Sequence, residues 1–376
     1  MYKPGKHLAE LDGLRGAAIL LVLVYHLTRM IPVVALDKAI KLITGSAWIG
    51  VDLFFVLSGF LITGILFDTK TESAYFRNFF MRRILRIFPL YYGFLLVLFF
   101  IVPLWLQNDE IWLLQSNQSW YWTYTTNFMI WLKGFDAAPY TSHFWSLAIE
   151  EQFYLLFPFL VYFCNPKQLM TVCALLIPAA FLARLGFRWS EEPLANYVLT
   201  FTRADALATG ASVALLIRYE WGIRLLRRLV KPLLIATGIL LMAIFLDEHG
   251  LKPGSFLMQT IGYSSVALFF GGILTWIILT QPASLLAHFW RLPILTFFGH
   301  YSYALYLFHV PVLKWVEQFN LIDGLPRLAG SKLLGQFAFA AVCMIISITL
   351  SYLSWHLYEK HFLTLKKRFV YTQQYL

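Results

Sequence analysis

Long apolar stretches alternate with short polar ones along the chain, and this pattern predicts helices that cross a membrane. A helix needs about 20 mostly apolar residues to cross the hydrocarbon core of a bilayer. Ten stretches approach that length, and the shortest of them is the weakest candidate. The predicted spans are 14–35, 47–67, 85–106, 144–164, 170–187, 197–217, 232–247, 257–280, 294–316 and 333–357. We therefore expect an all-α bundle of about ten transmembrane helices that forms a single domain, residues 1–376.

The composition supports a protein that faces lipid. Of the 376 residues, 59% are hydrophobic and 13% are charged, whereas a soluble domain carries about 25% charged residues. Cys164, Cys173 and Cys343 lie in apolar stretches without the Cys/His spacing of a metal site, so we expect neither a metal nor a disulfide framework. No signal-peptide cleavage site follows the first apolar run, which predicts a retained span.

Lysine and arginine are distributed unequally between alternate loops. If the N-terminus is cytoplasmic, the inner segments contain 18 of these residues and the outer segments contain 9. Because cytoplasmic loops carry the excess of positive charge, both termini are predicted to be cytoplasmic. The net charge of +10 is thus explained by topology, and nucleic acid is not an expected partner.

The predicted outer loop 107–143 is too polar to span and unusually rich in aromatic residues. Its rings, which include Trp120 and Trp122, suit an aromatic belt at the membrane interface. Flat apolar ring faces also suit stacking on a sugar, and both interpretations remain open at this stage. No soluble domain accompanies the predicted spans, so any chemistry is expected within or beside the bundle.

Arg15 and His26 flank the apolar part of the first span. Eleven residues are close to three helical turns, so both side chains lie on one face, ~16 Å apart along the axis. The pair is compatible with an interfacial anchor and a packed core histidine. Ionisable groups at membrane depth more often line a functional cavity, and histidine is suited to proton transfer near neutral pH.

Arg82, Arg83 and Arg86 occupy the cytoplasmic entry to the third span, and the last two share a helix face. They are compatible with simple topological anchoring. Arginine also binds phosphates bidentately, so the alternative is a site for a polyphosphorylated cytosolic ligand.

Further charges lie within or beside other predicted spans. Glu150 or Glu151 must point into the bundle, either toward a structural partner such as Arg184 or Arg203, or toward His26 or an acceptor hydroxyl. Arg203 and Asp205 are predicted to pair with other helices. Asp52 and His309 are candidate substrate-binding residues, whereas Ser58 is expected to serve close packing.

Taken in order, five motifs resemble the membrane-bound acyltransferase-3 family, with matching character from about residue 8 to 360. The motifs are LDGLRG with Arg15 and His26, WIGVDLFFVLSGFLITG, RRILRIFPLYY, FWSLAIEEQFYLLFP and SYALYLFHVP.

The resemblance implies transfer of an acyl group, most often acetyl, from cytoplasmic acyl-CoA to a hydroxyl of a carbohydrate or lipid-linked glycan. It implies a ten-span protein of the bacterial inner membrane with both ends inside. Residues required in that family fall on Arg15, His26, Arg83 and Arg86. Glu150 matches the acidic position of the fourth-span motif, and His309 matches the histidine of the Tyr-Leu-x-His stretch. Some members carry an extracytoplasmic esterase-like domain, which is not expected here.

The hypothesis that follows places the CoA phosphates on Arg83 and Arg86, helped by Arg15 and Arg82. His26 is the general base, oriented by Glu150, and the acceptor approaches from the outer side past Trp120 and Trp122. A covalent acyl-histidine is a variant of this mechanism. The rival class is a proton-coupled transporter or exporter, which also needs buried ionisable groups, although no paired halves or matched broken helices are evident.

Overall fold

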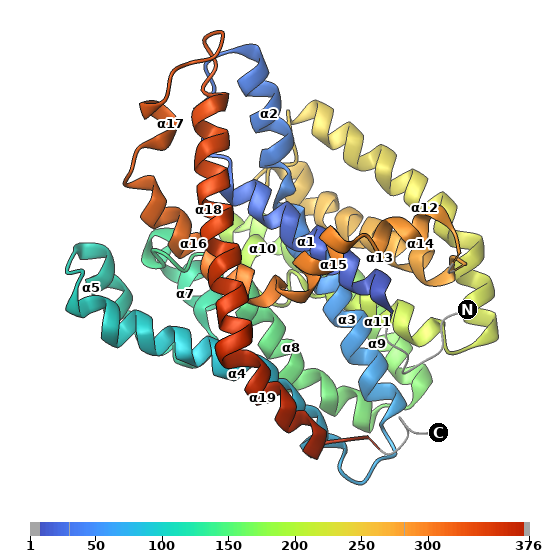
Figure 1. Cartoon of the computed structure of the whole chain (residues 1–376). Coiled ribbons are helices and arrows are strands. Elements are labelled where there is room, and N and C mark those ends of the chain that lie inside the picture. The colour runs from blue at the N-terminus through green and yellow to red at the C-terminus, as the bar shows by residue number, and fades with distance from the viewer. Residues whose placement is uncertain (1–7, 30, 282, 372–376) are drawn as a thin grey trace.

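The computed structural model describes residues 8–29, 31–281 and 283–371, and these residues form helices and no strand. The first half of the chain contains α1 (Ala9–Leu27), α2 (Ala35–Gly45), α3 (Gly50–Asp68), α4 (Tyr75–Leu96), α5 (Asp109–Ser116), α6 (Gln118–Trp122), α7 (Thr126–Lys133), α8 (Phe144–Phe163), α9 (Pro166–Trp189) and α10 (Pro193–Val198) (Figure 1). The second half contains α11 (Ala204–Leu216), α12 (Glu220–Asp247), α13 (Tyr263–Leu279), α14 (Leu285–Trp290), α15 (Pro293–His300), α16 (Ser302–Glu317), α17 (Leu321–Gly324), α18 (Leu333–Ser354) and α19 (Lys360–Thr364).

Each of the ten predicted spans overlaps a helix. Seven helical segments in the described part of the chain are long and apolar enough to cross a membrane: Ala35–Asp68, Tyr75–Leu104, Phe144–Phe163, Pro166–Trp189, Glu220–Asp247, Met258–Leu279 and Leu333–Arg368. The other three predicted spans, the first, the sixth and the ninth, do not correspond to a single long apolar helix. Three charged residues lie in the first half of α1, α11 has only 13 residues, and the ninth predicted span is divided between α15 and α16. The structure thus confirms an all-helical membrane protein, and the number ten remains a prediction.

Several predicted boundaries are wrong, including those of the third span, whose helix begins at Tyr75, and of the sixth, whose helix begins at Ala204. The least secure span, 232–247, belongs to the 28-residue helix α12, because the basic stretch before Pro232 is helical as well. The first predicted span, 14–35, extends too far, because α1 ends at Leu27 and the chain turns toward α2. The outer loop 107–143 contains three short helices, α5 to α7.

Contacts between loops distinguish the two ends of the bundle. On the predicted outer side, Trp48 Nε1 donates to Leu251 O at 2.6 Å, and Ser331 Oγ donates to Asp37 at 2.5 Å. On the predicted inner side, Arg218 pairs with Asp68 at 2.5 Å. These contacts join outer loops to outer loops and inner loops to inner loops, as alternate crossing requires.

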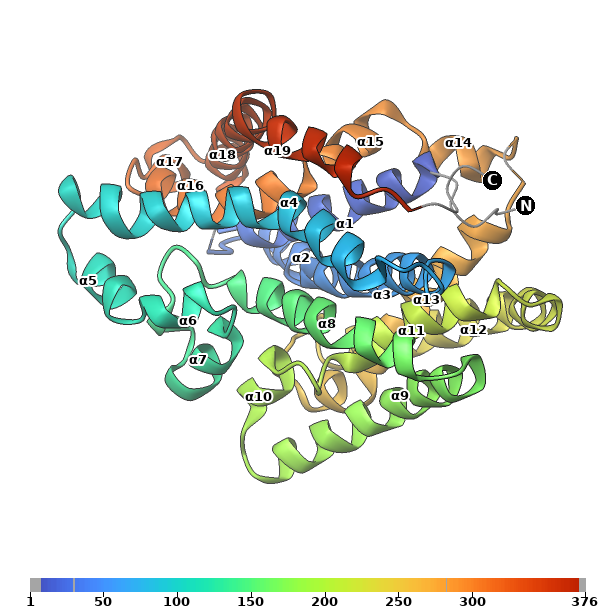
Figure 2. The ribbon, with the colours of Figure 1, turned by 90° about the horizontal axis from the view of Figure 1, so that it is seen from below.

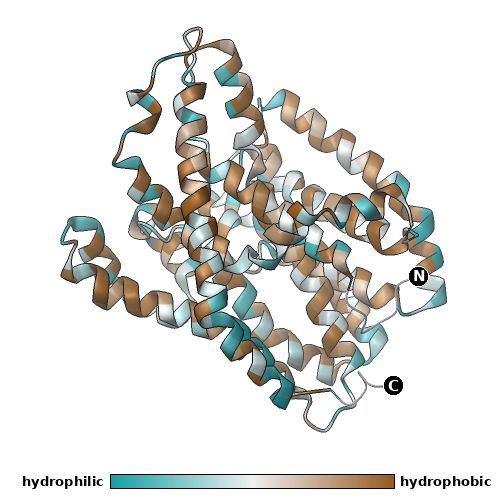
Figure 3. Ribbon diagram, in the orientation of Figure 1, coloured by the Kyte–Doolittle hydropathy of each residue, from teal (hydrophilic) through white to brown (hydrophobic). Residues whose placement is uncertain are grey.

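The C-terminal end of the described chain lies at the predicted inner end of the bundle. Asn78 and Arg82 at the start of α4 donate to Val370 O and Phe369 O, each at 3.0 Å. Polar residues are concentrated in α19 and at the Glu220 end of α12, whereas apolar residues cover most of the long helices (Figure 3). Residues 1–7 and 372–376 lie outside the described residues, and the cytoplasmic position of the termini stays a prediction.

The centre of the bundle is formed by α1, α3, α8 and α11, while α9, α12 and α18 are peripheral (Figure 2). Two close helix contacts depend on glycine. A Cβ atom on Gly210 would lie 1.9 Å from Val56 O, where α11 crosses α3, and one on Gly16 would lie 1.9 Å from Leu295 O, where α1 crosses α15. Small residues let helix backbones approach in this way in membranes. The result is a tight core around α1 and α3, which carry the candidate site.

Candidate active site

An inner cavity of about 100 Å³ brings together three of the predicted site arginines. Arg15 enters it from α1, and Arg83 and Arg86 enter it from one face of α4, as their spacing of three residues requires. Glu150 and Ser58 complete its polar lining from α8 and α3. Residues distant in sequence therefore line one charged cavity.

A second cavity, of about 140 Å³, adjoins the first toward the predicted cytoplasmic side. It shares the same three arginines and adds Arg82, Lys366 and Tyr371. Arg82 also holds the C-terminal segment, because it donates to Phe369 O and lies 5.3 Å from the Tyr371 ring centre. Lys366 was not predicted as a site residue, since its position in a run of basic residues resembles an ordinary anchor.

Few carboxylates neutralise the arginine cluster, which we define as Arg15, Arg83 and Arg86. Arg15 pairs with Asp12 at 3.3 Å on its own helix. Arg83 and Arg86 make no ion pair within the described ranges, although Arg83 lies 5.7 Å from the Tyr154 ring centre. Unpaired guanidinium groups around a cavity are suited to an anionic ligand that supplies the missing charge.

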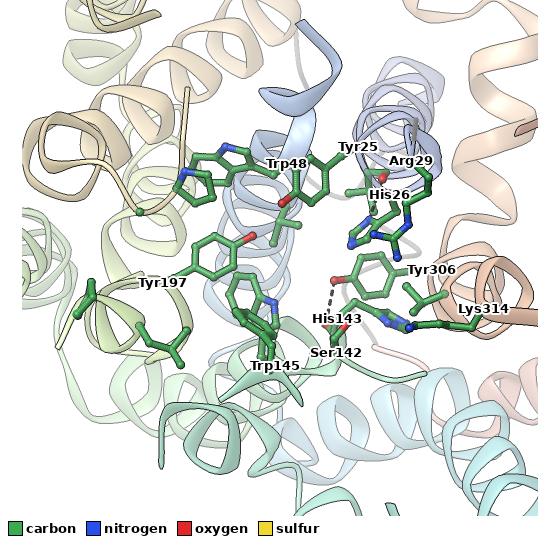
Figure 4. A pocket seen from close by; sticks show the side chains of 18 of the residues that line it. Tyr25, His26, Arg29, Trp48, Ser142, His143, Trp145, Tyr197, Tyr306 and Lys314 are labelled. Atoms are coloured by element: carbon green, nitrogen blue, oxygen red, sulfur yellow. Dashed lines mark hydrogen bonds between the residues drawn. The ribbon is translucent and has the colours of Figure 1, made fainter. Parts of the chain in front are cut away.

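The outer cavity is larger, about 480 Å³, and has two unlike sides (Figure 4). His26, His143, Arg29 and Lys314 lie on one side, and an aromatic wall lies on the other. We define the aromatic wall as Trp48, Trp145 and Tyr197. The ring centres of Trp145 and Tyr197 are 4.6 Å apart, and those of Trp48 and Tyr197 are 5.7 Å apart.

His309 contacts two other histidines, each from a different element, beside this cavity. The His309 ring centre is 4.9 Å from that of His26 and 4.7 Å from that of His143. His309 is buried behind the other two, which line the cavity. His143 was missed by the sequence analysis, because it stands one residue before the fourth-span motif and at the end of a polar loop.

The hydrogen bond of His26 determines which nitrogen is free for chemistry. Its Nδ1 lies 2.9 Å from Val22 O, and a carbonyl oxygen can only accept, so Nδ1–H donates. The neutral ring then leaves Nε2 with a lone pair. His309 repeats this arrangement, with Nδ1 donating to Tyr306 O at 2.7 Å. Each imidazole is fixed in the tautomer whose Nε2 can accept a proton.

The inner and outer cavities meet at Val51 and Tyr306, which line both. The Tyr306 hydroxyl donates to His143 O at 3.1 Å and is hydrogen-bonded to Ser146. A side chain on α16 and one on α3 therefore form the partition between the arginine cluster and the histidines.

Glu150 is placed differently from the prediction. It lies in the inner cavity and accepts from Ser58 at 2.7 Å, while His26 bonds to its own helix. The predicted orientation of His26 by Glu150 is wrong. Helix α8 runs inward from His143, so its start reaches the histidines and Glu150, two turns later, reaches the arginines. Ser58 lines this cavity instead of serving only helix packing.

Asp52 does not line any of these three cavities. It accepts from Arg203 at 2.6 Å in an interior where both side chains are buried. Arg184 and Asp205 form a second buried pair at 2.9 Å, so Arg203 and Asp205 each pair with another helix, as predicted. Arg203 lies 5.8 Å and 5.7 Å from the ring centres of Trp48 and Tyr197, behind the aromatic wall. Asp52 thus supports that wall from behind.

Trp120 and Trp122 lie on α6, away from the three cavities. Trp122 stacks on Tyr92 with a ring-centre distance of 5.8 Å and an angle of 5°, and Trp120 packs partly buried against the core. The structure assigns no cavity position to either ring. The aromatic surface that faces a cavity comes instead from α8, α10 and the residues before α3.

A model of the acyltransferase-3 acyltransferase domain matches residues 8–356. The chain belongs to this family.

Two relatives in the acyltransferase-3 family carry names that state an activity. The peptidoglycan O-acetyltransferase OatA of Listeria monocytogenes is 28% identical over 363 residues, which cover 89% of this chain and 55% of OatA. The O-acetyltransferase OatA of Staphylococcus aureus is 27% identical over 353 residues, which cover 87% of this chain and 54% of that protein. The chain thus spans about half the length of these curated relatives. No solved structure matches.

Proposed function

We propose that this protein transfers an acyl group, with acetyl as the leading candidate, from cytoplasmic acyl-CoA to a hydroxyl of a carbohydrate or lipid-linked glycan. Membership of the acyltransferase family and the O-acetyltransferase names of the relatives support the reaction class. The observation that carries the proposal is the series of adjoining cavities, which leads from the arginine cluster past Tyr306 to His26.

The arginine cluster is the proposed donor site. CoA carries a diphosphate and a ribose phosphate, and planar guanidinium groups bind such oxygens bidentately. Arg15, Arg83 and Arg86 face one cavity, and Arg82 and Lys366 extend the positive surface toward the inner end. The slender pantetheine arm then follows the cavity past Val51 and Tyr306.

His26 is the proposed general base. Its Nε2 takes the proton of the acceptor hydroxyl while the hydroxyl oxygen attacks the thioester carbonyl. The new C–O bond forms, the C–S bond breaks, and the proton on His26 passes to the leaving CoA sulfur. His309 packs against the His26 ring and holds it in place.

Glu150 is proposed to act at the donor end. Its carboxylate faces the cavity of Arg15 and Arg83 while Ser58 holds it. In the absence of donor it partly balances the cluster, which would otherwise gather several positive charges in a low-dielectric interior.

The direct test replaces His26 by alanine in the purified full-length protein. Acetyl transfer from radioactive acetyl-CoA to glycan acceptors is then measured in proteoliposomes. We expect transfer to fall by about 10²–10⁴-fold, the usual contribution of a general base, with acetyl-CoA binding retained. His288→Ala, on the exposed surface of α14, is the matched control and should be fully active. Full activity of His26→Ala would refute the proposal, and rapid-quench labelling of the protein would reveal an acyl-histidine instead.

A further inference from the structure

The outer cavity contains two cations that topology does not explain. Arg29 follows α1 and Lys314 lies in α16, and both line the cavity on the predicted outer side. Positive residues are favoured on the inner side of a membrane protein, so anchoring accounts poorly for this pair. No aspartate or glutamate is among the lining residues of this cavity.

These cations have spare capacity to bind an anion. Lys314 has no hydrogen-bond or ion-pair partner among the residues that the structure describes. Arg29 pairs through Nε with Glu317 at 3.0 Å, and its two terminal NH₂ groups donate no hydrogen bond within the described chain. Arg29 and Lys314 lie on the same side of the cavity as His26 and His143 (Figure 4), and the two cations give that side a positive potential.

The opposite side supplies a complementary surface. Trp48 and Trp145 are buried, so the aromatic wall is rigid, and Arg203 packs behind it. Indole and phenol faces offer flat apolar surface to the C–H groups of a sugar ring, and rigid aromatic side chains lose little entropy on binding. The cavity therefore combines a platform for a ring with a fixed site for an anion.

We infer that the outer cavity binds an anionic glycan. The sugar ring lies against the aromatic wall, and a carboxylate or phosphate on that glycan binds Lys314 and the free NH₂ groups of Arg29. The attacking hydroxyl then faces His26. This assignment rests on the proposed acyl transfer for the role of the ligand as acceptor, and it adds the charge that the acceptor carries.

The test measures binding without any acyl donor, so its outcome is independent of whether acyl transfer occurs. The probes are methyl glucoside, methyl glucuronide and methyl glucoside 6-phosphate, titrated into the full-length protein in neutral detergent and followed by saturation-transfer NMR. We expect at least one anionic glycoside to bind about tenfold tighter than the neutral one, the effect of one charge-assisted contact. The carboxylate and phosphate arms identify which anion is preferred.

Lys314→Gln, alone and with Arg29→Gln, should remove this preference and leave the weak binding of methyl glucoside unchanged. Lys38→Gln makes the same charge change on exposed α2 at the same end of the molecule and should keep the preference. Three outcomes overturn the inference: equal or undetectable binding of all three glycosides, a preference that survives the double variant, or displacement of the anionic glycoside by CoA. The last result would assign the two cations to the donor.

Discussion

Two groups of arginines lie inside this bundle, and they differ in how their charge is balanced. Arg184 and Arg203 are fully buried, and each pairs with a carboxylate from another helix at less than 3 Å. Arg83 and Arg86 are half-buried around cavities and, in the described residues, have no carboxylate partner. The first group joins helices, and the second leaves its charge available to a ligand.

Burial of a charged side chain therefore has two different consequences in a membrane protein. A buried ion pair has already exchanged its water for a partner, so removing one member leaves an uncompensated charge. An arginine beside a cavity keeps contact with water until a ligand replaces that water.

Asp52→Ala should produce the largest effect on folding. It leaves Arg203 buried without its carboxylate, and breaking such a pair costs about 3–5 kcal/mol. Unfolding of the purified protein in detergent measures the loss, and Asp52→Asn, which retains one acceptor oxygen, should lie between wild type and alanine. Asp323→Ala is the control, since its pair with Lys332 is half exposed and contributes about 1 kcal/mol or less. Equal stability of Asp52→Ala and Asp323→Ala would contradict the structural role of this pair.

Replacing Arg83 and Arg86 together by glutamine should weaken acetyl-CoA binding by about 100-fold. Each charged hydrogen-bonded contact contributes about 1.5–3 kcal/mol, and 1.4 kcal/mol corresponds to tenfold. Titration calorimetry measures the affinity, and the unfolding midpoint should stay near that of wild type. Arg224→Gln removes an exposed arginine from the start of α12 and should change neither quantity. Unchanged donor affinity in the double variant would return these arginines to topological anchoring.

Lys366→Gln should have a smaller effect of the same kind. The side chain lies at the rim of the arginine cluster, where water screens its charge, so the expected loss of acetyl-CoA affinity is about fivefold or less. Lys367→Gln changes the adjacent, exposed residue and serves as the matched control. If both variants bind acetyl-CoA as the wild type does, Lys366 is not part of the donor site.

The smallest expected effect is that of salt, which should weaken binding of acetyl-CoA to the cavity arginines more than it weakens the buried ion pairs. Raising the ionic strength from 0.05 to about 0.5 M shortens the screening length severalfold and should weaken acetyl-CoA binding measurably. The unfolding midpoint should respond much less, because the Arg184 and Arg203 pairs are shielded from solvent. A larger response of stability than of donor affinity would invert the comparison.

The helices were predictable because the bilayer imposes a local rule. About 20 apolar residues suffice to cross, and every predicted span overlaps a helix in the structure. The rule failed at the ends of helices, where α12 continues through a basic stretch that hydropathy assigns to a loop. The helical pattern was also sufficient to place Arg83 and Arg86 on one face, and the structure brings Arg15 to the same cavity.

The site was predictable only where its residues share a helix or a side of the membrane. Glu150 and Asp52 are charged positions in spans; the pattern predicted that Glu150 orients His26 and that Asp52 binds substrate, and the structure places neither residue in that position. Their actual partners, Ser58 and Arg203, depend on how the helices are rotated against one another. His143, Lys314 and Lys366 carried no distinguishing signal, because each lies at a helix end where polar residues are ordinary.

Composition and spacing along single helices were enough to predict an integral membrane bundle and a charge pattern that distinguishes its two sides, and the ordered motifs were enough to indicate the family. Helix packing determines which charges pair and which remain open, and it brings His309 into contact with both His26 and His143 while Glu150 faces the arginines. Side-chain partners are set by helix rotation and by close glycine contacts such as that of Gly210. Such contacts between distant parts of the chain leave no period in the sequence.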